Sequence, residues 1–192
     1  MGGRVQRLNG NMLLLNLYLS QAVILLTAVL LLWWQGRLNE HLFTWREGED
    51  WGIGALAGLA VVLIDWLLAR WLPEEWLDDG GLNRLLFQNL PVWHIAVVTA
   101  LVAVAEELLF RGAVQYWLGV FGSALLFTAI HFRYLRKWVM VTVLFVVSLG
   151  LGWLTEWTHS LTAAMVAHFL LDFVLGVCIR LGKMPGAKIT EE

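Results

Sequence analysis

The 192-residue sequence is poor in cysteine and in charged residues. Its single cysteine, Cys178, lies in an apolar stretch, so a disulfide bond within the chain is excluded. Charged residues make up 15% of the chain, against about 25% in an average soluble domain. The net charge is -2, and no basic stretch is long enough to predict nucleic-acid binding. We therefore expect no nucleic-acid partner.

Hydrophobic residues, in contrast, make up 59% of the chain and include 12 tryptophans. A membrane-spanning helix needs about 20 mostly apolar residues. The sequence predicts a single domain over residues 1–192, an all-α polytopic membrane bundle with about six spans. The first run is longer than a signal peptide's apolar region, and no cleavage site follows it, so we expect it to be retained. The apolar tracts are Met12–Trp34, Trp51–Leu72, Val92–His131, Trp138–Glu156 and Leu161–Leu181.

The third tract is long enough to cross the membrane twice, with a turn at Gly119 and Gly122. Residues at equal distances on either side of such a turn lie at equal depth. A reversal at Gly119 therefore brings Glu106 and His131 together, both roughly 18–20 Å from the turn at ~1.5 Å per residue. A turn-rich loop at Pro73–Gly81 and a short interfacial helix at Leu82–Leu90 are expected before this tract.

The distribution of lysine and arginine predicts the orientation of the spans. With the amino terminus inside, ten of the 13 basic residues fall in inner segments or at the inner ends of spans. We therefore expect an integral protein of the bacterial plasma membrane with both termini in the cytoplasm.

Three ionisable side chains interrupt the third tract within six residues: Glu106, Glu107 and Arg111. Charges inside a membrane are costly and usually mark function. On a helix, Glu107 and Arg111 are four residues apart in the favourable orientation for an ion pair. That pair has a purely structural interpretation as well. Glu106 points about 100° away and has no local partner, so it is the available carboxylate.

Two further polar groups lie in the apolar spans: His131, four residues after Phe127, and His168, four residues before Asp172. His168 and Asp172 share a helix face at a depth close to that of Glu106. A carboxylate and imidazoles that converge in a dry bundle can hold and deprotonate a water. Two histidines and one glutamate, here Glu106, His131 and His168, are also a common zinc ligand set. Both arrangements are suited to hydrolysis of a peptide bond. Asp65 in the second span either lines the same cavity or pairs with Arg70.

These patterns, in this order and on successive apolar spans, resemble the three motifs of the CPBP intramembrane proteases (CAAX proteases and bacteriocin-processing enzymes, also called the Abi family). The resemblance covers roughly residues 92–181 and implies a CAAX-protease-like peptidase. Many relatives have Asn where this chain has Asp172, which leaves the role of that position open. The matching residues are Glu106-Glu107-x-x-x-Arg111, Phe127-x-x-x-His131 and His168-x-x-x-Asp172.

By this resemblance Glu106 activates water, and His131, His168 and Asp172 hold the water, the oxyanion or a metal. Supporting roles fall to Glu107, Arg111 and Phe127. The family has been described both as metalloproteases and as glutamate-dependent proteases, so zinc and no metal both remain open. The expected substrate is a peptide or membrane protein, cleaved near the cytoplasmic side of the bilayer. Two alternatives remain: a small proton-coupled transporter, and an inactive scaffold of the same family.

Overall fold

The computed structural model describes residues 2–39, 42–43, 48–77, 80–134 and 137–183, and all regular structure in these ranges is helical. This confirms the all-α class. The predicted loop at Pro73–Gly81 contains one short helix, α3, and the interfacial helix, α4, ends a turn earlier than expected. The elements are α1 (Gly2–Trp34), α2 (Gly48–Trp71), α3 (Glu74–Leu77), α4 (Leu82–Phe87), α5 (Val92–Glu107), the π-helix η2 (Leu108–Val114), α6 (Gln115–Ile130), the 3-10 helix η3 (Phe132–Tyr134), α7 (Trp138–Thr158) and α8 (Leu161–Arg180).

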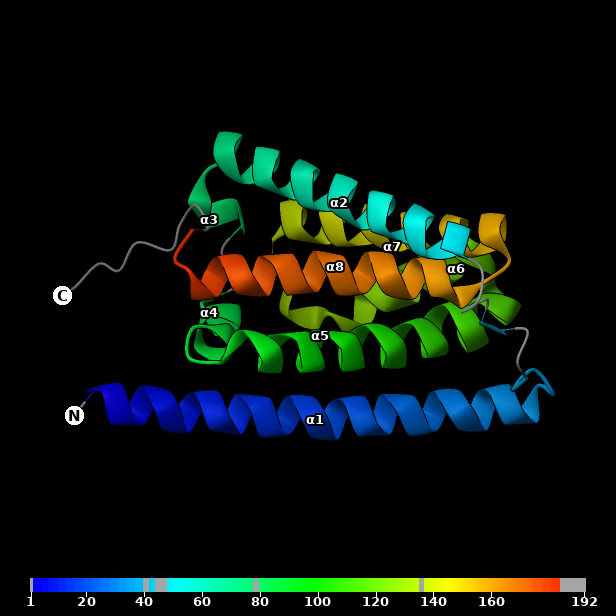
Figure 1. The fold of residues 1–192 in the computed structure, drawn as a ribbon, viewed down its shortest axis with the longest axis horizontal. Helices are drawn as coiled ribbons and strands as arrows, with labels where there is room; N and C mark the ends of the chain where they lie inside the picture. Colours follow the sequence, from blue (N-terminus) through cyan, green and yellow to red (C-terminus); the bar gives the residue numbers. More distant parts are fainter. Residues whose placement is uncertain (1, 40–41, 44–47, 78–79, 135–136, 184–192) are drawn as a thin grey trace.

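The long helices lie side by side along one axis, with α8 at the centre (Figure 1). α8 packs against α2, α5 and α7, whereas α1 covers α5 and η2 from the outside. α1 begins and α8 ends at the same end of the bundle, which we call the terminal end; the other is the distal end (Figure 1). Within the described ranges, five helical stretches are long and apolar enough to cross a membrane, and they coincide with the five predicted tracts.

The third stretch reverses direction at Gly119, as predicted. This residue has φ 66° and ψ -179°, a conformation that only glycine adopts readily. Beyond it the chain runs back along η2, as the 4.9 Å distance between the ring centroids of Phe110 and Phe127 shows. Gly122 lets the return arm start close to the turn, since a Cβ there would lie 2.8 Å from that of Leu118. The return arm stops being helical at Ile130, well short of the roughly 20 residues that a full span needs.

The central helix and α2 approach each other closely through small residues. A Cβ at Gly54 would lie 2.5 Å from the carbonyl oxygen of Ala163, and one at Gly58 would lie 2.7 Å from that of Ala167. Such small-residue contacts let two membrane helices pack backbone to backbone. Because both contacts advance by four residues on each helix, α2 and α8 run parallel and in register. This packing fixes α2 against the helix that carries His168.

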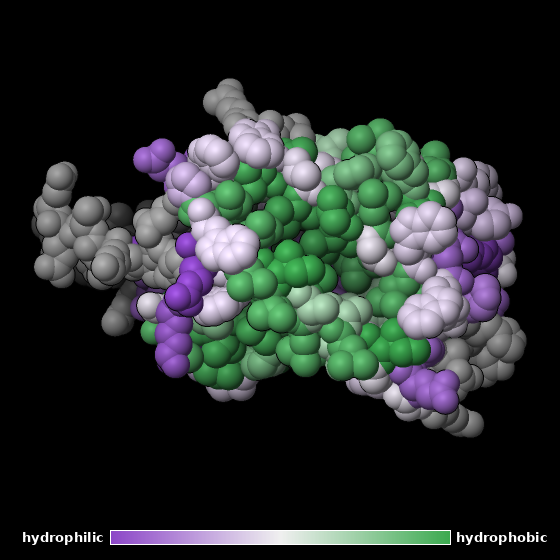
Figure 2. All heavy atoms as spheres, turned by 90° about the horizontal axis from the view of Figure 1, so that it is seen from above, coloured by the Kyte–Doolittle hydropathy of each residue, from purple (hydrophilic) through white to green (hydrophobic). Residues whose placement is uncertain are grey.

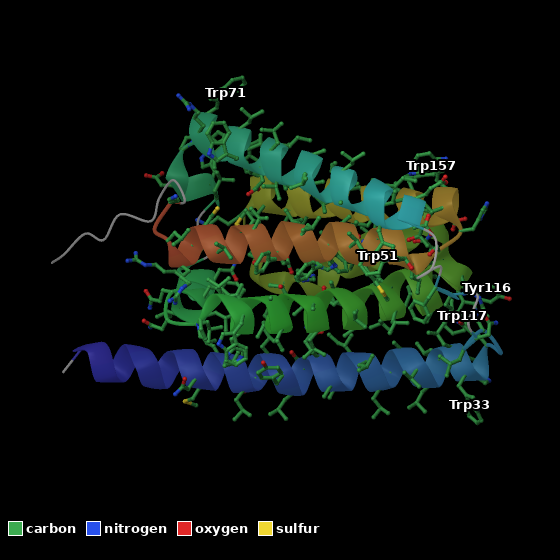
Figure 3. The ribbon with its side chains drawn as sticks, viewed as in Figure 1. Trp33, Trp51, Trp71, Tyr116, Trp117 and Trp157 are labelled. Carbon is green, nitrogen blue, oxygen red and sulfur yellow. The ribbon has the colours of Figure 1, made fainter. Side chains whose placement is uncertain are left out.

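Aromatic side chains gather at the two ends of the bundle (Figure 3). Trp71 lies at the terminal end, whereas Trp33, Trp51, Trp117 and Trp157 lie at the distal end. All five are exposed. Tryptophan concentrates at membrane–water interfaces, where its apolar ring and its N–H are both accommodated. The aromatic ends, together with the exposed leucines and valines between them, agree with an integral membrane protein.

Candidate active site

Glu107 is the centre of a buried polar network that joins three helices. Its side chain is fully buried, and its Oε1 accepts hydrogen bonds from Arg111 Nη1 at 3.0 Å and from His168 Nδ1 at 2.7 Å. The predicted ion pair with Arg111 is therefore present, and His168 on α8 is an additional partner. A carboxylate bound to Nδ1 fixes the tautomer and the orientation of an imidazole ring. Glu107 thus positions His168.

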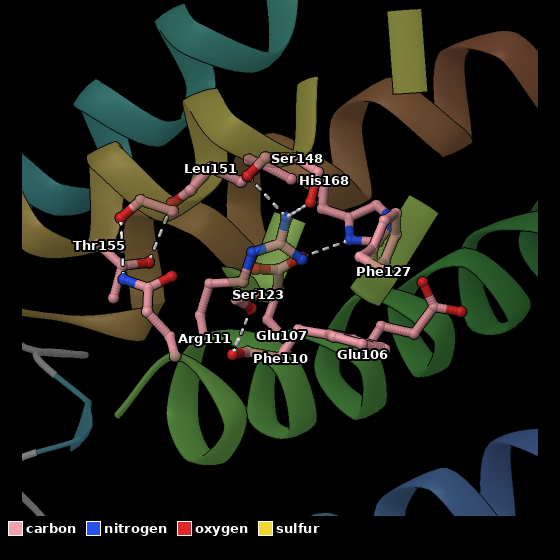
Figure 4. A network of polar contacts seen from close by, with 12 residues as sticks. Glu106, Glu107, Phe110, Arg111, Ser123, Phe127, Ser148, Leu151, Thr155 and His168 are labelled. Atoms are coloured by element: carbon pink, nitrogen blue, oxygen red, sulfur yellow. Dashed lines mark hydrogen bonds and ion pairs between the residues drawn. The ribbon is translucent and has the colours of Figure 1, made fainter. Parts of the chain in front are cut away.

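Arg111 extends the network from η2 to α7. Its Nη2 donates to the carbonyl oxygen of Ser148 at 3.0 Å and to the Ser148 hydroxyl at 2.9 Å (Figure 4). The guanidinium also lies over the ring of Phe127, with 4.9 Å from Cζ to the ring centroid. Arg111 is only 3% exposed, so its charge is neutralised inside the bundle by Glu107. This cation is consequently not available to Glu106.

Glu106, the neighbouring residue, points away from that network (Figure 4). It is 7% exposed, and its Oε1 accepts a hydrogen bond from Gln21 Nε2 of α1 at 3.2 Å. The electrostatic environment of Glu106 contains His168, His131 and Asp172. The four predicted catalytic residues therefore lie in one region: Glu106 comes from α5, His131 from the junction of α6 and η3, and His168 and Asp172 from α8. Glu106 is a buried carboxylate with two imidazoles beside it.

His131 directly follows α6 and is fixed by Phe127. Its Nδ1 donates to the Phe127 carbonyl oxygen at 2.7 Å, and the two rings lie 4.6 Å apart. Because a carbonyl oxygen only accepts, Nδ1 carries the hydrogen, and in the neutral ring Nε2 keeps a lone pair. That nitrogen can accept a hydrogen from a water molecule. The Phe127 ring thus contacts both the Arg111 guanidinium and the His131 ring.

Asp172 stands on the far side of His168. Its Oδ2 lies 3.5 Å from His168 Nε2, and about a third of its side chain is exposed. Carboxylates therefore flank the imidazole on both sides, Glu107 at Nδ1 and Asp172 near Nε2. A protonated His168 donates from both nitrogens, to Glu107 and toward Asp172 or a substrate oxygen.

A π-helix follows the two glutamates, a feature that the sequence analysis did not predict. η2 widens the helix over seven residues, and π segments in α-helices are frequent at functional sites. Side chains from other elements bind the carbonyl groups of this segment. The donors are Ser123 to Phe110 at 2.9 Å, Arg37 to Gly112 at 2.7 Å and Gln35 to Ala113 at 3.0 Å.

The zinc interpretation of Glu106, His131 and His168 finds no support in this geometry. Among the described residues, no three or more His, Cys, Asp or Glu side chains are grouped so that they could hold one metal ion. The hydrogen bonds to Glu107 and from Gln21 involve His168 Nδ1 and Glu106 Oε1, and they do not use His168 Nε2 or the second oxygen of Glu106.

Two residues of the network lie outside the motifs. Gln21 is 5% exposed in α1, and Ser148 is 2% exposed in α7. A glutamine inside an apolar span was a usable signal, because such a residue faces other helices more often than lipid. Serine at position 148 gave no signal of this kind. Its contact with Arg111 arises because α7 packs beside η2, and no local sequence pattern predicts that packing.

The fold and the site together define a class of protein, a helical integral membrane protein with a buried cluster of carboxylates, imidazoles and one arginine. Side chains of these types are the ones that hydrolases use for acid–base catalysis. Residues 88–174 match the family model described as type II CAAX prenyl endopeptidase Rce1-like. The chain is also 40% identical over 127 residues to the Bacillus subtilis (strain 168) protein "Uncharacterized protein YpbD", an alignment that covers 66% of this chain and 67% of that protein. No solved structure matches.

The chain thus belongs to the CPBP family of membrane proteases, in agreement with the resemblance that its motifs carry. The matched segment contains all seven motif residues, from Glu106 to Asp172. Membership places the protein among membrane-embedded CAAX-protease-like endopeptidases.

Proposed function

We propose that this protein is an intramembrane endopeptidase of the glutamate type, in which Glu106 activates a water for attack on a peptide bond. The observation that supports this most strongly is the contrast between the two glutamates. Glu107 is neutralised by Arg111 and bound to His168, whereas Glu106 has only an amide on one oxygen. Its Oε2 has no hydrogen-bond partner among the described residues, so it can accept a proton from water.

The remaining residues of the cluster complete the reaction. His131 Nε2 accepts the second hydrogen of the water and fixes its oxygen toward the carbonyl carbon. As the water oxygen bonds to that carbon, its proton passes to Glu106, and the developing oxyanion is stabilised by a protonated His168 through Nε2. Collapse of the intermediate breaks the C–N bond, and Glu106 returns the proton to the leaving amine. Asp172 orients His168 and the water.

We place cleavage near the cytoplasmic side. Helices α2 and α8 end at the terminal end, where α3 and α4 also lie (Figure 1). Arg70, Arg84, Arg180 and Lys183 belong to these helices or directly follow them, and Lys137 donates to the Glu75 carbonyl oxygen of α3. Basic residues concentrate on the cytoplasmic side. Both termini then lie in the cytoplasm of a bacterial cell. The substrate is a peptide or membrane protein, because the site lies inside the span region, where lipid-embedded chains have access.

The test compares peptide termini in membranes of cells that carry the wild-type protein, Glu106→Gln or the control Glu75→Gln at matched levels. Glu75 is an exposed acid of α3, outside the cluster. A membrane-proximal cleavage product is expected with the wild type and the control and is lost with Glu106→Gln. Full cleavage by Glu106→Gln would overturn the mechanism. A Glu106→Gln phenotype without any difference in termini would favour the scaffold or the transporter instead.

A further inference from the structure

An apolar groove leads from the bilayer face of the molecule to His168 of the candidate active site. α2 and α7 both pack against α8, and the groove between them encloses about 880 Å³ with α8 as its floor. Figure 2 shows hydrophobic atoms around a hollow on this side. The groove reaches His168, the residue that Glu107 orients. Because its walls are formed by membrane spans, it opens toward the hydrocarbon of the bilayer.

One carboxylate stands in this apolar wall. Of the residues that line the groove, only Asp65 of α2 and His168 are ionisable. Asp65 is half-buried, and within the described part of the chain it has no hydrogen bond or ion pair. Arg70, the local candidate, lies instead against the ring of Trp66 at 5.5 Å. A charged carboxylate at membrane depth is costly without a partner, and a cationic group of a bound ligand would supply one.

The register of α2 and α8 gives the separation of Asp65 from the site. Gly58 lies against Ala167, so Asp65 is level with Val174 on the parallel helix α8. That level is six residues from His168, or roughly 9 Å along the axis at ~1.5 Å per residue. An extended peptide covers this distance with about three residues at ~3.3 Å each. A group held by Asp65 therefore fixes which peptide bond of a bound chain lies beside His168.

We propose that the groove binds an apolar segment of the substrate and that Asp65 pairs with one lysine or arginine about three residues from the cleaved bond. This inference rests on the proteolytic function proposed above and specifies its substrate class. The apolar walls accommodate hydrophobic side chains, and the single carboxylate selects a single cation by charge complementarity. Asp65 is a specificity-determining residue that lies apart from the atoms that react.

Binding and cleavage are tested separately, with the full chain in phosphatidylcholine vesicles. The probes are three fluorescent leucine–alanine peptides that differ at one position, which holds lysine, the uncharged norleucine or glutamate. In the uncleaving Glu106→Gln background, the lysine peptide is expected to bind about tenfold more tightly than the norleucine peptide. Adding Asp65→Asn removes this preference, Asp65→Glu retains it, and Asp65→Lys transfers it to the glutamate peptide. The control Glu75→Gln, at the terminal end, leaves it unchanged.

Each result decides between the two proposals. A lysine preference that survives Asp65→Asn, or equal binding of the lysine and norleucine peptides, overturns the role of Asp65. So does a lipid that copurifies with the wild type and is lost with Asp65→Asn, when none of the three peptides binds. If the wild-type protein prefers the lysine peptide but does not cleave it, the proteolytic mechanism is overturned and the pairing with Asp65 stands. Equal melting temperatures of the Asp65 variants establish that the changes are local.

Discussion

The buried pair Glu107–Arg111 makes a quantitative prediction about stability. Replacing Glu107 by leucine removes the partner of Arg111 at 3.0 Å and that of His168 at 2.7 Å. Arg111 is 3% exposed and would keep its charge with the Ser148 hydrogen bonds and the ring of Phe127 as its neighbours, and neither is an anion. Breaking a buried ion pair in this way costs about 3–5 kcal/mol. For a chain of this size that corresponds to a melting temperature lower by roughly 6–20 °C.

The double variant Glu107→Leu/Arg111→Met separates an ion pair from two independent side chains. Because it leaves no unpaired charge, it is expected to recover most of the loss, as replacement of buried ion pairs by apolar groups of similar volume does. Thermal unfolding in detergent, followed by the fluorescence of the 12 tryptophans, measures all variants. The exposed Glu75→Gln serves as control and should change stability by less than about 0.5 kcal/mol.

The reasoning would be refuted by additivity. If the double variant loses as much stability as the single variants Glu107→Leu and Arg111→Met together, to within about 0.5 kcal/mol, the two side chains do not depend on each other. Glu107 and Arg111 would then not form a buried ion pair in the folded protein.

Two glycine predictions test the backbone geometry. Gly54→Ala is expected to destabilise the bundle by about 1–3 kcal/mol, since its Cβ would lie 2.5 Å from the Ala163 carbonyl oxygen. The control Gly52→Ala, whose Cβ would have nothing within 4 Å, should leave the stability unchanged or raise it by up to about 1 kcal/mol. Equal melting temperatures for the two variants would contradict the close packing of α2 on α8. Gly119→Ala places a side chain at φ 66° and ψ -179° and should cost about 1–3 kcal/mol, with no such loss if the chain did not reverse there.

The sequence was sufficient for what depends on local pattern. The apolar tracts became the long helices, and the turn at Gly119 followed from two glycines in an otherwise apolar tract. Equal counts on the two arms then predicted that Glu106 and His131 approach each other. Helical spacing alone also predicted that Glu107 pairs with Arg111.

What remained unpredicted depends on how helices are placed relative to one another. Helical spacing shows that Glu107 reaches Arg111, but the second contact, to His168, requires α5 and α8 to be adjacent. In the same way, Gln21 meets Glu106 across 85 residues of sequence. The π-helix has no pattern of its own, since it replaces one hydrogen-bond register by another in an apolar run. Catalytic roles for the cluster stay predictions until cleavage is measured.

The central position of α8 has a consequence for synthesis. This helix follows all the other described spans, yet it supplies His168 and Asp172 and contacts α2, α5 and α7. While the chain is being made, Glu107 and Arg111 can already pair, but the imidazole that they position is not yet in the membrane. Gly54 and Gly58 of α2 also have no packing partner until α8 is inserted. Insertion of α8 is therefore the step that gives α2 its packing partner and completes the cluster of candidate catalytic side chains, and a chain released before Leu161 lacks both.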